Sequence, residues 1–150
     1  MYDRPSPRET RVCDSDDSRL AVRIQASNKY PLSSVIVLTE RCNLSCPHCY
    51  QTKEKRGQEL STGEILRLLD ELAEAGTLYL TLTGGEPALR SDITEIVAAA
   101  SGHHFALILQ SNGTLLRESL VEALFAAGLR KLKVSLYHDD SVEHDRFVGL

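Results

Sequence analysis

Residues 39–50, Thr-Glu-Arg-Cys-Asn-Leu-Ser-Cys-Pro-His-Cys-Tyr, carry three of the four cysteines of the chain. Cys42, Cys46 and Cys49 follow the spacing Cys-x3-Cys-x2-Cys and come directly after the apolar run Val35-Ile36-Val37-Leu38. A structural zinc site takes four ligands, and a disulfide framework takes an even number of cysteines in a small secreted chain. Three thiolates this close together suit an iron–sulfur cubane in which one iron has no protein ligand. An open coordination position can bind and activate a substrate, so the spacing points to chemistry.

A zinc site with His48 as the fourth ligand is the alternative for this loop. His48 lies between Cys46 and Cys49, so its side chain is expected to point away from a metal that these cysteines hold. Thiolates are soft ligands that suit iron–sulfur clusters. The residues of the loop leave both kinds of site open.

From Tyr30 onward, the sequence alternates between strand and helix patterns. Alternating strands and helices imply a parallel sheet that helices cover on one or both faces. The first helix is expected to begin at Ser61, because Glu64 completes a capping box, and Gly76 supplies its stop. The strands are expected at Val35–Thr39, Leu78–Thr83, Phe105–Gln110 and Lys131–Leu136, and the helices at residues 61–76, 91–102 and 116–128, with the opening of a fourth helix in residues 141–150.

Three further motifs follow the cysteine loop in chain order. Gly84-Gly85-Glu86-Pro87 comes after the second expected strand, Ser111-Asn112-Gly113 after the third, and Ser135 lies in the fourth. Together with the cysteine loop, this order resembles the radical S-adenosylmethionine (SAM) enzymes, over roughly residues 30–150. The resemblance implies an α/β fold, a partial parallel (β/α) barrel of the radical SAM type. Barrels of the family usually have six βα units, so this one would be truncated after its fourth strand.

The expected domains are an N-terminal extension, residues 1–28, and an incomplete radical SAM barrel, residues 29–150. The extension is expected to be partly disordered, because its first residues are rich in Arg, Asp, Ser and Pro. Leu20, Val22, Ile24 and Ala26 alternate with polar residues, as in a short half-buried strand. Cys13, in a polar segment, is expected to be an incidental free thiol.

The resemblance also implies roles for individual residues. Each of Cys42, Cys46 and Cys49 would hold one iron of a [4Fe-4S] cluster. The Gly-Gly-Glu-Pro turn would hold the amino group of SAM, and Ser111, Asn112 and Ser135 would bond the ribose or the methionine carboxylate. The residues expected to contact SAM are His48 (against the adenine), Gly84, Gly85, Glu86, Pro87, Ser111, Asn112, Ser135 and Arg146 (on the carboxylate).

Each of these assignments has a simpler alternative. Glycine and Asn-Gly are common in turns that bind nothing, and serine is common at caps. A solvated surface position suits Arg146 as well as a contact with the SAM carboxylate does. His138 and His144 are expected at the surface, and no side chain is assigned an acid–base role.

The activity that the resemblance implies is reductive cleavage of SAM by the cluster. The product, a 5′-deoxyadenosyl radical, would abstract hydrogen from a substrate, with flavodoxin or ferredoxin as electron donor. Val134-Ser-Leu-Tyr137 and His144-Asp145 resemble the SPASM branch, whose members modify peptides and proteins. The alternatives are a maturase of a small molecule or cofactor precursor, and an inactive metal-binding fragment.

Composition excludes several other partners. A net charge of -4 with 25% charged residues does not indicate a surface for nucleic acid. No apolar run approaches the roughly 20 residues that cross a bilayer, and the N-terminus lacks the apolar segment of a secretory signal. Reduced cysteines and an oxygen-sensitive cluster favour the cytoplasm.

Overall fold

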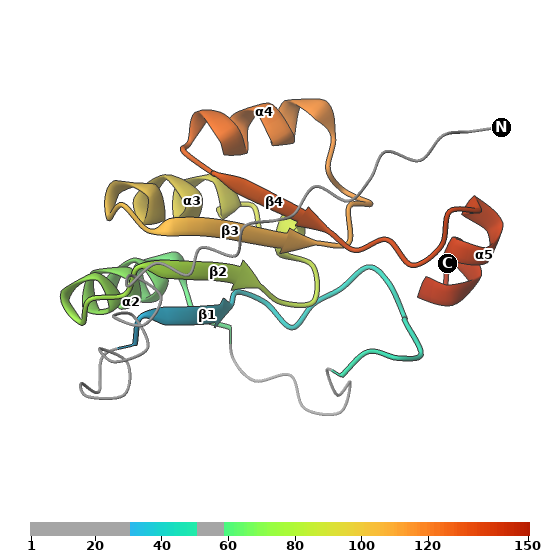
Figure 1. Cartoon of the computed structure of the whole chain (residues 1–150), viewed down its shortest axis with the longest axis horizontal. Helices are drawn as coiled ribbons and strands as arrows, with labels where there is room; N and C mark the ends of the chain where they lie inside the picture. Colours follow the sequence, from blue (N-terminus) through green and yellow to red (C-terminus); the bar gives the residue numbers. More distant parts are fainter. Residues whose placement is uncertain (1–30, 51–58) are drawn as a thin grey trace, which may run out of the picture. The chain divides into compact units, whose positions relative to one another are not determined.

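The computed structural model describes residues 31–50 and 59–150, and residues 31–150 form one compact unit. Its sheet has four parallel strands in the order β1-β2-β3-β4 (Figure 1). This confirms the expected α/β class with a parallel sheet. The expected N-terminal extension, the strand near Val22 and Cys13 lie outside the described residues. The strands are β1 (Ser33–Val37), β2 (Tyr79–Thr83), β3 (Ala106–Ser111) and β4 (Lys131–Val134).

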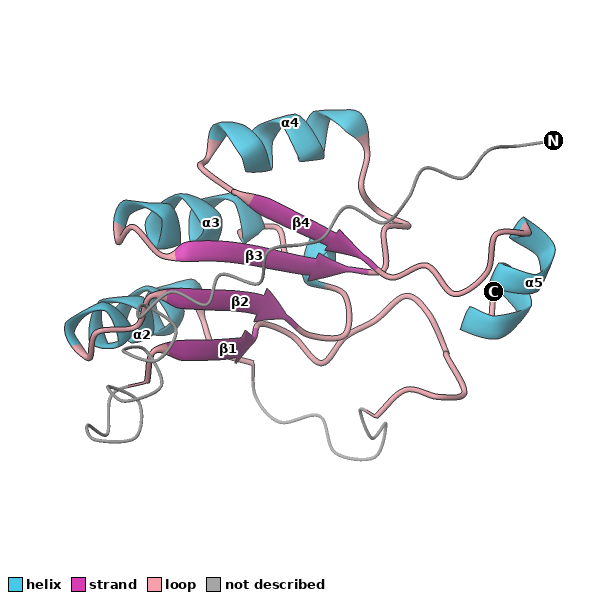
Figure 2. Ribbon diagram, in the orientation of Figure 1, coloured by secondary structure: helices cyan, strands magenta, loops and turns pink. Residues whose placement is uncertain are grey.

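Helices α2, α3 and α4 lie on one face of the sheet, and α5 lies beyond the carboxyl ends of the strands (Figures 1 and 2). Helix α2 begins as expected: Glu64 N–H donates to the Ser61 hydroxyl at 3.4 Å, and Ser61 N–H donates to the Glu64 carboxylate at 2.8 Å. Gly76 ends it with a φ of 86°. The helical elements are α2 (Thr62–Glu74), the 3₁₀ helix η1 (Pro87–Leu89), α3 (Ile93–Gly102), α4 (Glu118–Ala126) and α5 (Ser141–Val148).

Two helices start later than expected. Helix α3 begins at Ile93 rather than Ser91, because Ser91 and Asp92 form a turn in which Ile93 N–H donates to Arg90 O at 3.4 Å. Helix α4 begins at Glu118, because Leu116 N–H donates to Gly113 O at 3.2 Å and so closes a turn ahead of the helix. Strand β4 ends at Val134, two residues before the expected end.

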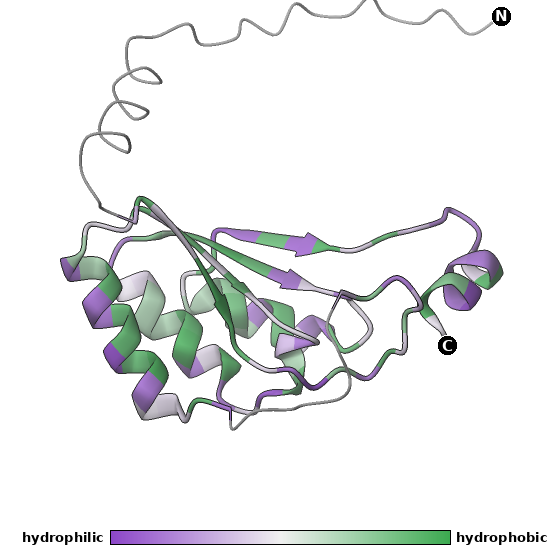
Figure 3. Ribbon diagram, turned by 90° about the horizontal axis from the view of Figure 1, so that it is seen from below, coloured by the Kyte–Doolittle hydropathy of each residue, from purple (hydrophilic) through white to green (hydrophobic). Residues whose placement is uncertain are grey.

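The core lies between the sheet and its three helices. Alternate residues of β1, β2 and β3 are buried in this layer against apolar residues of the helices. Figure 3 shows the helices on one side of the sheet, with hydrophobic residues in green on both. On the other face Val35, Val37 and Tyr79 are exposed, with Val35 64% accessible. The buried strand residues are Ile36, Leu80, Leu82, Leu107 and Leu109, and their partners include Ile65, Leu69, Ile96, Val97 and Leu124. Within residues 31–50 and 59–150, every helix is too short or too polar to span a bilayer.

Candidate active site

The cysteine loop leaves the carboxyl end of β1, the edge at which open parallel sheets bind ligands. Cys49 N–H donates to Cys46 O at 3.1 Å, so these two cysteines stand at the ends of one turn. Leu44 N–H lies 3.4 Å from the Cys42 sulfur. The loop therefore holds its cysteines by local backbone geometry.

The Gly-Gly turn after β2 is joined directly to the start of the cysteine loop. Gly85 N–H donates to Thr39 O, and Glu86 N–H donates to Arg41 O, both at 2.8 Å. A Cβ on Gly85 would lie 2.6 Å from the Arg41 carbonyl carbon and 3.0 Å from the Cys42 Cβ. Only glycine permits this approach without moving the backbone that carries Cys42.

Glu86 is fully buried and lies behind this turn. Its carboxylate accepts hydrogen bonds from Ala88 N–H and the Ser111 hydroxyl, both at 2.9 Å, and from Asn112 N–H at 2.7 Å. These donors satisfy both carboxylate oxygens. Glu86 thus ties the turn after β2 to the end of β3.

The three cysteines line one pocket at the carboxyl edge of the sheet. Most of the residues expected to contact SAM meet them there, but Glu86, Pro87 and Arg146 do not line it. Glu86 and Pro87 are buried, and Arg146 lines a separate hollow beside His48. The expected residues in the pocket wall are Cys42, Cys46, Cys49, His48, Gly84, Gly85, Ser111, Asn112 and Ser135, and those that the sequence did not suggest include Thr83, Gln110, His144 and Val148.

Helix α5 and the segment before it present two aromatic rings to the cysteine loop. The His48 ring lies 4.6 Å from both the Tyr137 ring and the Phe147 ring, measured between centroids. His144 was expected at the surface, and this is wrong: its side chain is only 16% exposed and lines the pocket. Its Nε2 is buried and has no hydrogen-bond partner. The sequence does hold a sign of this burial: His144 and the buried Val148 stand four residues apart, and so lie on one face of α5.

The donor set of the pocket fits an iron–sulfur cluster. Three thiols face one cavity, and Gly84 and Gly85 line the same cavity close to Cys42. In the part of the chain that the structure describes, no three His, Cys, Asp or Glu side chains surround a point that would hold a single metal ion. The His48 ring packs against Tyr137 and Phe147.

The model of the radical SAM superfamily matches residues 36–148. The chain belongs to the radical SAM superfamily. Enzymes of this superfamily use a [4Fe-4S] cluster and SAM, so both groups are those that the pocket is expected to hold.

Curated radical SAM relatives include two kinds of enzyme. An AdoMet-dependent heme synthase of Methanosarcina barkeri is 40% identical over 115 residues, which are 75% of this chain and 33% of the relative. A PqqA peptide cyclase of Granulibacter bethesdensis is 37% identical over 122 residues, 80% of this chain and 33% of the relative. The chain therefore spans about a third of the length of these relatives.

Solved structures share the fold. Streptococcus suis SuiB bound to S-adenosylmethionine superposes with a TM-score of 0.70 at 23% identity, over 87% of this chain and 31% of SuiB. SuiB bound to its precursor peptide SuiA gives a TM-score of 0.71 at 21% identity, over 97% of this chain and 34% of SuiB. The arrangement of strands and helices is thus that of a radical SAM barrel.

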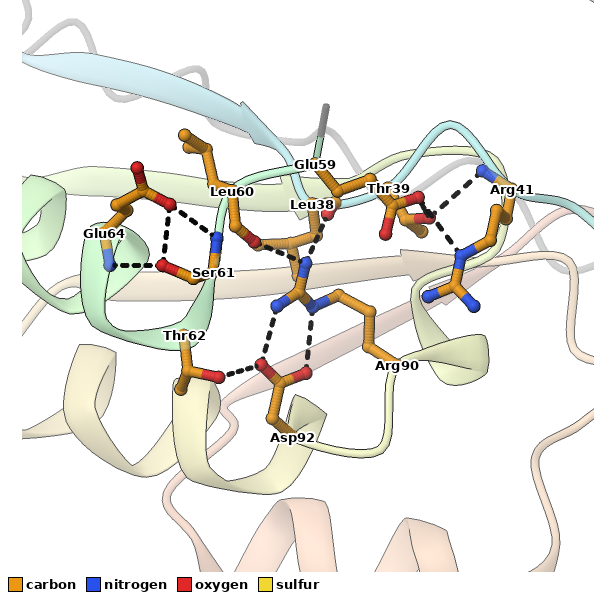
Figure 4. A network of polar contacts seen from close by, with 10 residues as sticks. All are labelled: Leu38, Thr39, Arg41, Glu59, Leu60, Ser61, Thr62, Glu64, Arg90 and Asp92. Atoms are coloured by element: carbon orange, nitrogen blue, oxygen red, sulfur yellow. Dashed lines mark hydrogen bonds and ion pairs between the residues drawn. The ribbon is translucent and has the colours of Figure 1, made fainter. Parts of the chain in front are cut away.

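A buried arginine closes the radical SAM cysteine loop at its base (Figure 4). Arg90 Nη1 donates to Leu38 O and to Leu60 O, both at 3.0 Å, so one guanidinium joins the residues on either side of loop 39–59. Its Nε and Nη2 bind the Asp92 carboxylate at 2.9 and 2.6 Å. Nearby, Glu59 accepts hydrogen bonds from Thr39 and Arg41. The two ends of the loop are thereby held together.

We expect this ion pair to make stability depend on acid pH. The hydrogen bonds from Arg90, and then that from Thr62, lower the pKa of Asp92 from 3.8 to about 2 against the opposing effect of burial. Because the folded pKa is depressed, the stabilisation is present above about pH 4 and is lost as pH falls toward 2, by about 2 kcal/mol. Urea unfolding measured from pH 6 to pH 2 should show that the difference in free energy of unfolding between the native chain and Asp92→Asn disappears as the pH falls from about 4 to 2. A constant gap would contradict the assignment.

Proposed function

We propose that this chain binds a [4Fe-4S] cluster through Cys42, Cys46 and Cys49 and SAM in the pocket beside them, as part of an enzyme that modifies a peptide. The observation that carries the proposal is the single pocket in which three thiols, the Gly84-Gly85 turn and Ser135 converge. Three thiolates leave one iron of a four-iron cluster without a protein ligand. The free iron is where the amino and carboxylate groups of SAM would bind.

Once loaded, the cluster and SAM supply reductive cleavage of SAM and, from it, hydrogen abstraction from a substrate. The protein's part is to bind, orient and exclude water. The backbone carbonyls of the Gly84-Gly85 turn can accept hydrogen bonds from the ammonium group of SAM. The Ser135 hydroxyl can bond a ribose hydroxyl or the carboxylate, and the His48 ring offers a flat surface to the adenine.

Two expected SAM contacts take other roles in this proposal. Glu86 and Pro87 hold the Gly-Gly turn in place from beneath, because both are buried behind it. Arg146 would reach the methionine carboxylate from the neighbouring hollow that it lines with His48. Electrons would come from flavodoxin or ferredoxin in the cytoplasm.

A peptide is the substrate class that the similar proteins favour. The chain is 37% identical to a PqqA peptide cyclase, and its fold matches SuiB, whose structure has been solved with the precursor peptide SuiA. The second candidate is a small tetrapyrrole substrate, which the 40% identity to an AdoMet-dependent heme synthase favours. The two candidates share the cluster and the SAM pocket and differ only in what enters the barrel.

Anaerobic reconstitution of the full chain with iron and sulfide tests the proposal. We expect a brown protein with about four irons per chain and, after reduction, an electron paramagnetic resonance signal that changes when SAM is added. Stoichiometric zinc without a response to SAM would overturn it. The substrate class is tested by whether a short peptide encoded beside the gene, or a tetrapyrrole, stimulates release of 5′-deoxyadenosine. Stimulation by the tetrapyrrole alone would replace the peptide proposal with the second candidate.

A further inference from the structure

Asn112 lies directly after β3, and its side-chain amide reaches the cysteine loop. Its Nδ2 is 3.8 Å from the Cys42 sulfur and 3.0 Å from Asn43 Oδ1. Its Oδ1 accepts hydrogen bonds from Thr114 N–H at 2.9 Å and from the Thr114 hydroxyl at 2.7 Å. The amide therefore contacts a proposed cluster ligand on one side and its own turn on the other.

The neighbours of this amide fix which end faces the sulfur. The Thr114 backbone N–H can only donate, so the atom beside it must be the oxygen of Asn112. The NH₂ group is then directed to Asn43 and Cys42. Its two hydrogens match these two acceptors, and rotating the amide by 180° would place a donor against a donor.

Three side chains lock this orientation in a closed ring of hydrogen bonds. The Thr114 hydroxyl donates to Asn112, Asn112 donates to Asn43, and Asn43 Nδ2 donates back to the Thr114 oxygen at 2.7 Å. Each group both donates and accepts once, so the ring is consistent all the way round, and such chains strengthen cooperatively. The ring joins the end of β3 to the residue next to Cys42.

The Cys42 sulfur therefore receives two N–H groups. One is the backbone N–H of Leu44 at 3.4 Å, and the other is the Asn112 amide. The ring holds the Asn112 amide in place, so this donor need not reorganise when charge on the sulfur changes. This is the arrangement by which a protein stabilises the more negative state of a metal centre.

We infer that Asn112 sets the reduction potential of the cluster by donating a hydrogen bond to the Cys42 sulfur. The inference rests on the proposed function, because it requires Cys42 to be a cluster ligand. One-electron reduction adds negative charge to the cluster and its thiolates, and an N–H aimed at one of them stabilises the reduced state. Asn112 thereby raises the potential and eases electron transfer to the cluster. It acts through Cys42 and is a positioning residue.

The test is a redox titration of the reconstituted full chain in the absence of SAM, followed by electron paramagnetic resonance. Asn112→Leu, which removes the donor, is expected to shift the potential to a more negative value. Each tenfold loss in the equilibrium constant for reduction corresponds to about 59 mV for one electron. Asn112→Asp keeps the shape but replaces the donor with an acceptor, and should give a shift at least as large. Because the charge of the aspartate would lower the potential even without the lost hydrogen bond, the uncharged Thr114→Val variant carries the test if Asn112→Leu does not fold.

Gln110→Leu is the matched control. Gln110 lines the same pocket and also carries an amide, but its recorded partner is the Thr83 hydroxyl at 3.3 Å rather than a cysteine. Its loss should leave the potential close to that of the native chain. Equal shifts in Gln110→Leu and Asn112→Leu would overturn the inference, since general pocket polarity would then explain both.

The outcomes separate this inference from the proposed function. If the native chain fails to assemble a four-iron cluster, the proposed function fails and the inference falls with it. If the native chain and the Asn112 variants hold equal iron at equal potentials, the inference alone is overturned. Thr114→Val, which breaks the ring but keeps the amide, should give a smaller shift of the same sign.

Discussion

Cys46→Ala is expected to reduce SAM cleavage below detection and to leave the chain without a stable four-iron cluster. Cys46 stands at one end of the turn that Cys49 closes, and both line the pocket with Cys42. Removing one of three thiolates leaves two irons without a protein ligand, so the cluster is no longer held at three corners. Alanine at Cys42 or Cys49 should have the same effect. Iron per chain after reconstitution and 5′-deoxyadenosine per chain under reducing conditions measure it.

The control is Cys13→Ala, which should leave iron content and SAM cleavage nearly unchanged. Circular dichroism of the metal-free proteins checks the fold: Cys46 is partly exposed, so its truncation should cost little stability. Full cleavage by the Cys46 variant would contradict the ligand assignment. Loss of cleavage in the Cys13 variant would show that the incidental role given to that thiol is wrong.

Much of the fold could be predicted because its signals are local. The Ser61 capping box and the Gly76 stop depend on residues within a few positions of each other, and both are confirmed. The start of α3 was placed two residues early, at Ser91, because the turn of Ser91 and Asp92 and the ion pair of Asp92 with Arg90 leave no mark in the helical periodicity. Cap residues and helical periodicity do not predict that a long side chain such as Arg90 will bind a nearby carboxylate.

In the site too, local motifs could be predicted from the sequence and long-range contacts could not. Spacing identified the cysteines and the Gly-Gly turn, since each motif requires particular residues within a short stretch. It could not show that Glu86 turns inward to Ser111, or that Asn112 meets Cys42, because these pairs are 25 and 70 residues apart. Contacts of this length arise only when the carboxyl ends of β1, β2 and β3 come together at one edge. His144 was missed for the same reason, because the cysteine loop with which it lines the pocket is remote in sequence.

Gly85→Ala is expected to displace the cysteine loop and to prevent stable cluster binding. The added Cβ would stand 2.6 Å from the Arg41 carbonyl carbon, and still closer to its oxygen, and both are backbone atoms that no side-chain rotation can move aside. Relief requires the Gly-Gly turn and the loop to separate, which stretches the hydrogen bonds from Gly85 to Thr39 and from Glu86 to Arg41. Overpacking of this kind costs about 1–3 kcal/mol, and the displaced segment carries Cys42.

Gly63→Ala provides the comparison that separates steric displacement from a general effect of glycine replacement. Gly63 lies in the first turn of α2, and a Cβ there would meet nothing within 4 Å. Because alanine favours helix over glycine, this variant should be neutral or more stable by up to about 1 kcal/mol, with iron content unchanged. The urea midpoint and the iron per chain should therefore both fall in Gly85→Ala. In Gly63→Ala the midpoint should stay the same or rise, and the iron content should not change. A Gly85→Ala chain that unfolds at the native urea concentration and holds four irons would mean that the cysteine loop is not held against the Gly-Gly turn, and the close approach on which the SAM pocket depends would be wrong.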